Sequence, residues 1–253
     1  MFRIHDDLWI VPGRPVLYVP SLKYLVIADL HLGFEEEMAS KGVYLPRVQL
    51  DKIISMLEEI LDSSGLRVEG IIVNGDLKHS FSRLTRRERE EAERLLGFLE
   101  KRGLRVELIR GNHDNYLAIV AHRHGLELRD RLVHLDLVLT HGHLDLSPPG
   151  PGRIVVIGHE HPALVVRDTI GSVARFPCFL DIPLDTGGRM LVMPAAGPYQ
   201  SGNPVSLRRT NYLSPLTRKH GVVEEARPYV IDEEVGVLEF PPLRAMADLI
   251  ADT

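Results

Sequence analysis

The first half of the chain alternates short apolar runs with longer segments in which apolar residues recur at helical spacing. Residues 25–28, 70–73 and 106–109 are largely apolar runs, which is typical of strands buried on both faces. Between them, residues 46–65 and 84–102 place apolar side chains along one face, as core-packing helices do. The order strand, helix, strand, helix, strand predicts an α/β protein with a parallel sheet whose ligands gather beyond the carboxyl ends of the strands.

The pattern changes in the second half of the chain. Short apolar runs follow one another there without long helices between them, at residues 135–140, 154–157, 163–166 and 191–193. Such spacing indicates a second sheet. Residues 8–18 contain two prolines and predict a short edge hairpin. We predict one domain over residues 1–253, with the motifs in a core at 25–165 and with 166–253 completing the second sheet.

Composition and charge narrow the classes of function. A chain of 253 residues with 44% hydrophobic and 26% charged residues has ordinary globular composition. The formal net charge of -5 argues against a generally basic nucleic-acid binder. Cys178 is the only cysteine, so an internal disulfide and a thiolate metal cluster are both excluded.

No apolar run approaches the roughly 20 residues that a membrane helix needs. Residues 1–15 carry Asp6, Asp7 and Pro12 where a signal peptide would need an apolar core. We therefore expect a cytoplasmic protein without a membrane partner.

Five short polar islands each follow an apolar run. They are Asp29-Leu30-His31, Gly75-Asp76, Gly111-Asn112-His113-Asp114, His141-Gly142-His143 and Gly158-His159-Glu160-His161. One such island is weak evidence, because Gly, Asn and Asp are common in turns. Five islands in order, each at the end of an apolar run, favour a functional site.

The islands supply oxygen and nitrogen ligands for divalent metals. The proposed ligand set is Asp29, His31, Asp76, Asn112, His141, His159 and His161. Carboxylate and imidazole together suit zinc, iron or manganese. Asp76 is the candidate bridge, because two neighbouring cations need a shared anion to offset their repulsion. Metal 1 would then take Asp29, His31, Asp76 and His161, and metal 2 would take Asp76, Asn112, His141 and His159.

Local spacing suggests how Asp29 and His31 reach the same ion. Residues i and i+2 of an extended chain point to the same side, so we expect these two side chains to face one metal together. A metal pair of this kind activates a bridging water as hydroxide, neutralises phosphoryl oxygens and holds an ester in line for attack. The ligand set therefore predicts a two-metal phosphoesterase.

The remaining polar residues of the islands are candidates for catalysis. His113 adjoins the ligand Asn112, so we expect it to protonate the leaving alkoxide as a general acid, oriented by Asp114. His143 and His79 are candidates for supporting the ligands or contacting the substrate. The segment His159-Glu160-His161 is not H-E-x-x-H, so a helical metalloprotease is not supported. The sequence contains neither a P-loop nor a G-x-G-x-x-G motif.

In order and residue type, the islands resemble the five motifs of the calcineurin-like metallophosphoesterase superfamily, D-x-H, G-D, G-N-H-[DE], H-G-H and G-H-x-H. The resemblance spans residues 29–161. It implies a four-layer α-β-β-α sandwich with two mixed β-sheets, two divalent ions, the ligand roles given above and His113 near the leaving group. Many members carry Asp or Asn three residues after the bridging Asp, where this chain has His79.

Three segments resemble a narrower branch, namely residues 5–33, GDLKHSF at 75–81 and MPAAGPY at 193–199. They are similar to small archaeal phosphoesterases related to double-strand-break repair nuclease subunits and to bacterial ligase-associated phosphoesterases. This resemblance implies a phosphodiesterase or nuclease acting on DNA or RNA. The expected cofactors are two divalent ions, Mn2+ first, with Zn2+, Fe or Mg2+ as alternatives.

Two other functions remain open at this point. One is a phosphomonoesterase of the same fold, and the other is a catalytically silent interaction scaffold. A scaffold has no need for an acid beside Asn112, so the presence of His113 together with every ligand argues against it. The sequence leaves the oligomeric state open.

Overall fold

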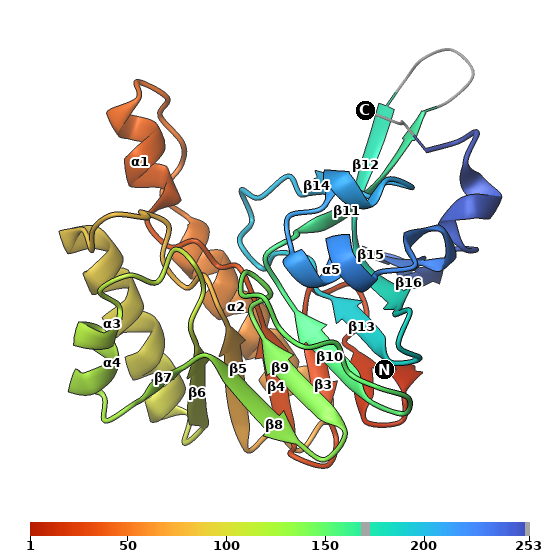
Figure 1. The fold of residues 1–253 in the computed structure, drawn as a ribbon. Helices are drawn as coiled ribbons and strands as arrows, with labels where there is room; N and C mark the ends of the chain where they lie inside the picture. The colour runs from red at the N-terminus through yellow and green to blue at the C-terminus, as the bar shows by residue number, and fades with distance from the viewer. Residues whose placement is uncertain (168–172, 251–253) are drawn as a thin grey trace.

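Two β-sheets face each other in the computed structural model, which describes residues 1–167 and 173–250 (Figure 1). Within these residues the first sheet has the strand order β1-β2-β3-β4-β5-β6-β7. The second has the order β14-β11-β12-β13-β10-β9-β8, with β15 and β16 added beside β12. Both sheets combine parallel and antiparallel pairs, so the predicted α/β fold with two mixed sheets is confirmed. Residues 168–172 and 251–253, which the predicted range 166–253 includes, lie outside the described residues.

The first sheet contains the parallel strands that the apolar runs predict. Its strands are β1 (Phe2–His5), β2 (Leu8–Ile10), β3 (Leu17–Val19), β4 (Tyr24–Ile27), β5 (Gly70–Asn74), β6 (Arg105–Ile109) and β7 (Leu128–Arg129). Strands β4 to β7 pair in parallel. The predicted hairpin is the antiparallel pair β2 and β3, but it lies between β1 and β4, and β1 forms the edge of the sheet. The carboxyl ends of β4, β5 and β6 therefore meet at one edge of the sheet.

Helices cover the outer face of this sheet (Figure 1). They are α2 (Gln49–Ser63), α3 (Arg86–Lys101) and α4 (Ala118–Arg123). Helix α1 (Phe34–Ser40) lies beyond the ends of the strands instead (Figure 1). Helix α2 buries Ile53, Leu57 and Ile60, which recur at helical spacing. Helix α3 begins with a capping box in which Thr85 and Glu88 satisfy each other's backbone N–H groups.

The second sheet is built from strands β8 to β16. They are β8 (Arg131–His134), β9 (Leu137–Thr140), β10 (Ile154–Ile157), β11 (Pro162–Arg167), β12 (Val173–Pro183), β13 (Arg189–Val192), β14 (Asn203–Pro204), β15 (Arg227–Asp232) and β16 (Gly236–Glu239). Strand β10 pairs in parallel with β9 and β13. Strand β12 is not among the predicted strands, because Arg175, Pro177 and Asp181 interrupt its apolar run.

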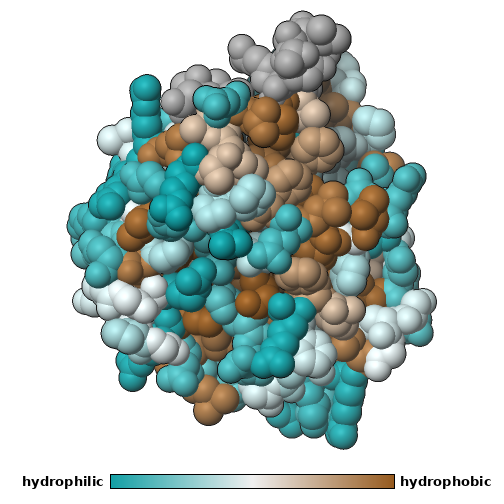
Figure 2. All heavy atoms as spheres, turned by 90° about the vertical axis from the view of Figure 1, so that its right-hand side faces the viewer, coloured by the Kyte–Doolittle hydropathy of each residue, from teal (hydrophilic) through white to brown (hydrophobic). Residues whose placement is uncertain are grey.

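The fourth layer is thin. It consists of α5 (Pro215–His220) and the short 3-10 helices η1 (Arg209–Asn211), η2 (Val223–Glu225) and η3 (Leu243–Met246). Leu216 of α5 and Leu243 of η3 pack into one cluster with Leu180 of β12. Apolar side chains also remain on the surface of this side of the molecule (Figure 2). Exposed examples are Leu213, Val235 and Leu238.

A shared core lies between the two sheets. Val26 of β4 and Val156 of β10 belong to one buried cluster. Val155 and Ile157, which flank Val156 in the sequence, pack instead beneath the thin fourth layer. Successive residues thus face opposite layers, which explains why these strands are apolar throughout. In the part of the chain that the structure describes, no helix is both long and apolar enough to cross a membrane.

Candidate metal centre

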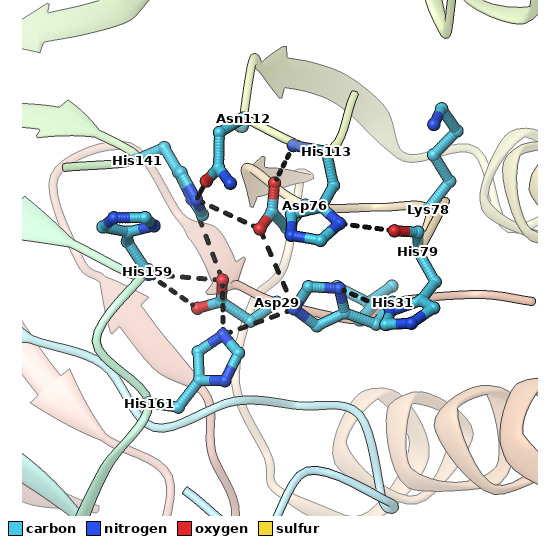
Figure 3. A network of polar contacts seen from close by, with 12 residues as sticks. Asp29, His31, Asp76, Lys78, His79, Asn112, His113, His141, His159 and His161 are labelled. Atoms are coloured by element: carbon cyan, nitrogen blue, oxygen red, sulfur yellow. Dashed lines mark hydrogen bonds and ion pairs between the residues drawn. The ribbon is translucent and has the colours of Figure 1, made fainter. Parts of the chain in front are cut away.

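The structure brings all seven predicted ligands together where strands from both sheets end (Figure 3). They follow strands β4, β5, β6, β9 and β10 in the order Asp29 and His31, Asp76, Asn112, His141, and His159 and His161. Each of these strands has a parallel neighbour, so their carboxyl ends deliver the side chains to a single point.

Asp29, His31 and His161 form the first ligand cluster, with ligand atoms within 4.8 Å of one another. The Nε2 atom of His161 lies 3.0 Å from Asp29 Oδ1 and 3.3 Å from His31 Nε2. Two imidazole nitrogens and a carboxylate oxygen therefore converge on one small volume. This is the arrangement that a divalent cation of intermediate softness prefers.

Asp76, His141 and His159 form the second cluster, also with ligand atoms within 4.8 Å of one another. The Nε2 atom of His141 lies 3.3 Å from Asp76 Oδ2 and 3.1 Å from Asn112 Oδ1. Asp76 Oδ2 also lies 3.8 Å from His31 Nε2, in the first cluster. The Asp76 carboxylate thus lies between the two clusters.

Most of the ligands have unusual backbone conformations. Asp29, His31, Asp76, His159 and His161 all have φ between 46° and 65°. This is the left-handed region, which L-residues avoid and which costs roughly 1–3 kcal/mol per residue. The extended i, i+2 geometry expected for Asp29 and His31 was therefore wrong. A turn after β4 aims both side chains, and the carbonyls of Gly75 and Asp76 hold it by accepting their backbone N–H groups at 3.0 and 2.9 Å.

The glycines of the islands are needed because the ligands pass close to the backbone. A Cβ on Gly111 would lie 2.0 Å from Asp76 Oδ1. A Cβ on Gly75 would lie 2.2 Å from His141 Nδ1, and one on Gly158 would lie 2.5 Å from Asp29 Oδ2. Each of these distances is shorter than any real contact, so a side chain at these positions would displace a ligand.

The buried carboxylates are surrounded by imidazoles. Burial raises the pKa of Asp29, but the charge of His161 and its hydrogen bond outweigh this effect, and the pKa lies below its ordinary value. Burial disfavours protonation of His141, yet the hydrogen bond to Asp76 and the charge of Asp29 raise its pKa to about 9. Burial lowers the pKa of His31 to about 3, so this ring stays neutral. Buried carboxylates beside imidazoles are the donor set that fits hard or borderline divalent cations, and a cation that binds here displaces the protons of the charged rings.

Backbone carbonyls orient two of the rings, and no residue type in the sequence marks these carbonyls. The carbonyl of Asn74 lies 3.1 Å from His141 Nδ1, so a proton on Nδ1 leaves Nε2 free to face the ligand cluster. The His113 ring donates from Nδ1 to the carbonyl of His79. The backbone N–H of His113 donates to Asp76 Oδ1 at 2.8 Å, which ties the GNHD turn to the ligand loop after β5.

Asp114 does not have the position expected for it. Its carboxylate accepts the backbone N–H of Gly111 at 2.8 Å and that of Lys78 at 3.3 Å. Because the side chain turns back into its own loop, the prediction that it orients His113 was wrong, and the His79 carbonyl holds that ring instead. Burial and the neighbouring charge of Asp76 raise the pKa of Asp114 to about 6.

His143 and His79 both lie beside the ligands. The His143 ring centroid is 5.4 Å from that of His141, and burial lowers its pKa. His79 Nδ1 lies 3.4 Å from His31 Nδ1, and His79 Nε2 lies 3.3 Å from Glu37 Oε2. His79 therefore contacts a ligand through its ring and His113 through its carbonyl.

Known proteins share this sequence pattern and this fold. The pattern of the calcineurin-like phosphoesterase family matches residues 22–176, and the chain belongs to that family. It is thus a hydrolase acting on phosphate esters, in a family that uses divalent metals. No curated protein sequence matches it.

The solved structures that resemble the chain include a nuclease and a phosphoesterase. The nuclease MPE of Pseudomonas putida is 22% identical over 92% of this chain and 94% of that one, with a TM-score of 0.63, and shows the same fold. YfcE, a phosphoesterase from E. coli, is 18% identical over 87% of this chain and 98% of that one, with a TM-score of 0.46.

We expect Gly111→Ala to abolish metal binding, because its Cβ would collide with Asp76. Gly97→Ala in helix α3 is the matched control, since its Cβ would have no neighbour within 4 Å. The control should retain metal and gain up to about 1 kcal/mol of stability, as Ala does in a helix. Equilibrium dialysis against Mn2+ and urea unfolding measure both effects. Full Mn2+ binding by Gly111→Ala would show that the close approach to Asp76 is unimportant.

Proposed function

We propose that this protein is a phosphodiesterase that works with two divalent cations, Mn2+ foremost. The position of Asp76 carries the proposal, because its Oδ2 atom lies 3.3 Å from His141 Nε2 and 3.8 Å from His31 Nε2. One carboxylate thus faces both ligand clusters, as a bridging ligand must. The first ion would be held by Asp29, His31, Asp76 and His161, and the second by Asp76, Asn112, His141 and His159.

When bound, such a pair of ions lowers the pKa of a water, neutralises phosphoryl oxygens and holds the ester for in-line attack. The chain supplies the ligand geometry through its fixed turns and the proton for the leaving group through His113. Since the His113 Nδ1–H donates to the His79 carbonyl, Nε2 is the atom that would deliver this proton to the alkoxide. No side chain needs to form a covalent bond to the phosphoryl group.

The proposed substrates are phosphodiesters, including those of DNA or RNA. The resemblance of GDLKHSF and MPAAGPY to nuclease-related phosphoesterases supports this choice. The fold shared with the nuclease MPE of P. putida is compatible with it. Asn112 and His113 come from the same turn, so a ligand and a proton donor are placed within one short segment.

Metal add-back tests the proposed activity. We expect the metal-stripped protein to hydrolyse bis-p-nitrophenyl phosphate once Mn2+ is restored, and to act less well on the monoester p-nitrophenyl phosphate. Asp76→Asn should lower the hydrolysis rate by more than the roughly 10- to 100-fold drop seen when a residue that supports a metal ligand is removed. Asp248→Asn, on the exposed surface, is the isosteric control and should retain activity. Failure of Mn2+, Zn2+ and Mg2+ alike to restore hydrolysis would favour a silent scaffold.

Replacing His113 by Asn should separate catalysis from metal binding. The variant keeps the backbone N–H that donates to Asp76 but loses the proton donor, so turnover should fall by about 10²- to 10⁴-fold. Metal content, measured by atomic emission, should not change. His122→Asn removes an exposed histidine of α4 and should have no effect. Unchanged turnover in His113→Asn would show that this ring is not the general acid.

Metal binding should weaken as the pH falls. In the metal-free protein the pKa of His141 is raised to about 9, so a cation must displace its proton at neutral pH. His31, with its pKa lowered to about 3, has no proton to lose in this range. We expect bound metal and activity to fall together below about pH 6. Calorimetry in two buffers at pH 7 should detect the release of protons when the metal binds. Metal binding without proton release would contradict this account. So would full occupancy of the metal sites at pH 5 together with a loss of activity.

A further inference from the structure

A row of aromatic rings borders the site on the side of His113. Tyr199 stacks on Phe34 with a centroid distance of 6.0 Å, and Phe34 meets His79 edge to face at 5.0 Å. His79 stacks on His113 at 5.7 Å, and Phe81 meets His113 edge to face at 5.7 Å. The rings of Phe34, Phe81 and Tyr199, which cannot bind a metal, therefore extend the two imidazoles into a continuous aromatic surface. We call these five residues the ring row.

The ring row is assembled from segments far apart in the sequence. Phe34 begins helix α1, and Tyr199 comes from the segment between β13 and β14. The hydroxyl of Tyr199 donates to the carbonyl of Pro46, which ties that segment to the start of α2. The carbonyl of Phe81 accepts a hydrogen bond of 2.9 Å from the side chain of Asn115, just beyond the GNHD turn. The backbone N–H of His79 donates to the carbonyl of Leu32 at 2.9 Å, close to Phe34 in the sequence. Each segment that carries a ring is thus hydrogen-bonded to a neighbouring segment.

Buried charges hold the loop that carries Phe81. The ammonium of Lys78, which is fully buried, donates to the carbonyls of Ser80 and Arg83. The buried carboxylate of Glu88 accepts the backbone N–H groups of Ser80 and Thr85. Both groups secure the loop from inside. The loop therefore does not need the Phe81 ring for its own packing.

Phe81 nevertheless presents a large apolar ring to solvent, with 58% of its surface exposed. An exposed phenyl ring stabilises the fold little, because little apolar area leaves water. One exposed apolar residue needs no explanation by itself. Here the ring stands edge-on, at 89°, to the imidazole proposed as the proton donor. Because more than half of its surface is exposed, the ring can contact a group that lies beside that imidazole.

We propose that the ring row is a subsite for the leaving group and that Phe81 stacks on an unpaired nucleobase of the leaving nucleoside. This inference rests on the proposed phosphodiesterase function and names its substrate class. A group that takes its proton from His113 must lie beside this ring, which Phe81 contacts with a centroid distance of 5.7 Å. A base inside a duplex has both faces covered by its neighbours, so only a single-stranded or unpaired base can stack in this way. Stacking of this kind accepts any base.

Dinucleotides test the subsite. The substrates are thymidylyl-thymidine and two analogues, one with an abasic sugar in the leaving nucleoside and one with it in the other nucleoside. Products of the unmodified substrate show which nucleoside leaves. With Mn2+ present, we expect the loss of the leaving base to lower kcat/KM by about tenfold or more, the range for loss of one base-stacking contact. Loss of the other base should have little effect.

Variants at Phe81 assign the effect to this ring. Phe81→Ala should lower kcat/KM for the unmodified dinucleotide by about tenfold and leave the value for the leaving-abasic analogue unchanged. Phe81→Trp should restore the preference, and Phe81→Leu, which keeps apolar bulk without a ring, should not. Phe176→Ala removes a partly exposed ring from β12, outside the ring row, and should behave as wild type. If Phe81→Ala fails to fold by circular dichroism, Phe81→Leu takes its place.

The outcomes separate the subsite from the proposed function. Equal hydrolysis of the unmodified and leaving-abasic dinucleotides by the wild type would overturn the subsite and leave the phosphodiesterase intact. An equal loss in Phe81→Ala on both substrates would also overturn it, because the ring would then act without the base. Absence of hydrolysis of every diester with every metal would overturn the proposed function and the subsite with it.

Discussion

The structure depends on how two buried carboxylates are stabilised. Asp29 and Asp76 are withdrawn from water where the edges of the two sheets meet, and the groups that stabilise their charge are mainly imidazoles. Burying an anion is costly unless it is paired or coordinates a metal. The turns that hold these residues are themselves strained, at φ of 57° and 50°. Cation binding by the same residues would offset both costs, which is why fold and metal chemistry are linked at this point.

Much of the fold follows from hydrophobic pattern. Strands β4 and β5 are buried throughout, and β6 is buried at Leu108 and Ile109, so their apolar runs could be recognised without a structure. Strand β12 could not, because residues 174–177 are exposed and Pro177 and Asp181 interrupt its apolar residues. The fourth layer was expected only from the family resemblance, since its helix α5 has only six residues and no long periodic signal.

The candidate ligands could be proposed from the sequence because a metal ligand's side chain must be of a given chemical type. Their supports could not, because many are backbone atoms, such as the carbonyls of Asn74 and His79. Any residue type can offer a carbonyl, so no sequence signal marks these positions. Asp114 shows the opposite error. Its place beside His113 in the sequence suggested that the two side chains are in contact, but its carboxylate accepts the backbone N–H of Gly111 instead. Phe81 lies two residues after His79, yet only its ring contact with His113 reveals a possible function.

The central claim is that Asp76 joins two metal sites. Anomalous diffraction from crystals soaked in Mn2+ tests it most directly. The account predicts two strong peaks, one among Asp29, His31 and His161 and one among Asn112, His141 and His159, with the Asp76 carboxylate between them. A single peak that does not touch Asp76, or no peak at these residues, would contradict it.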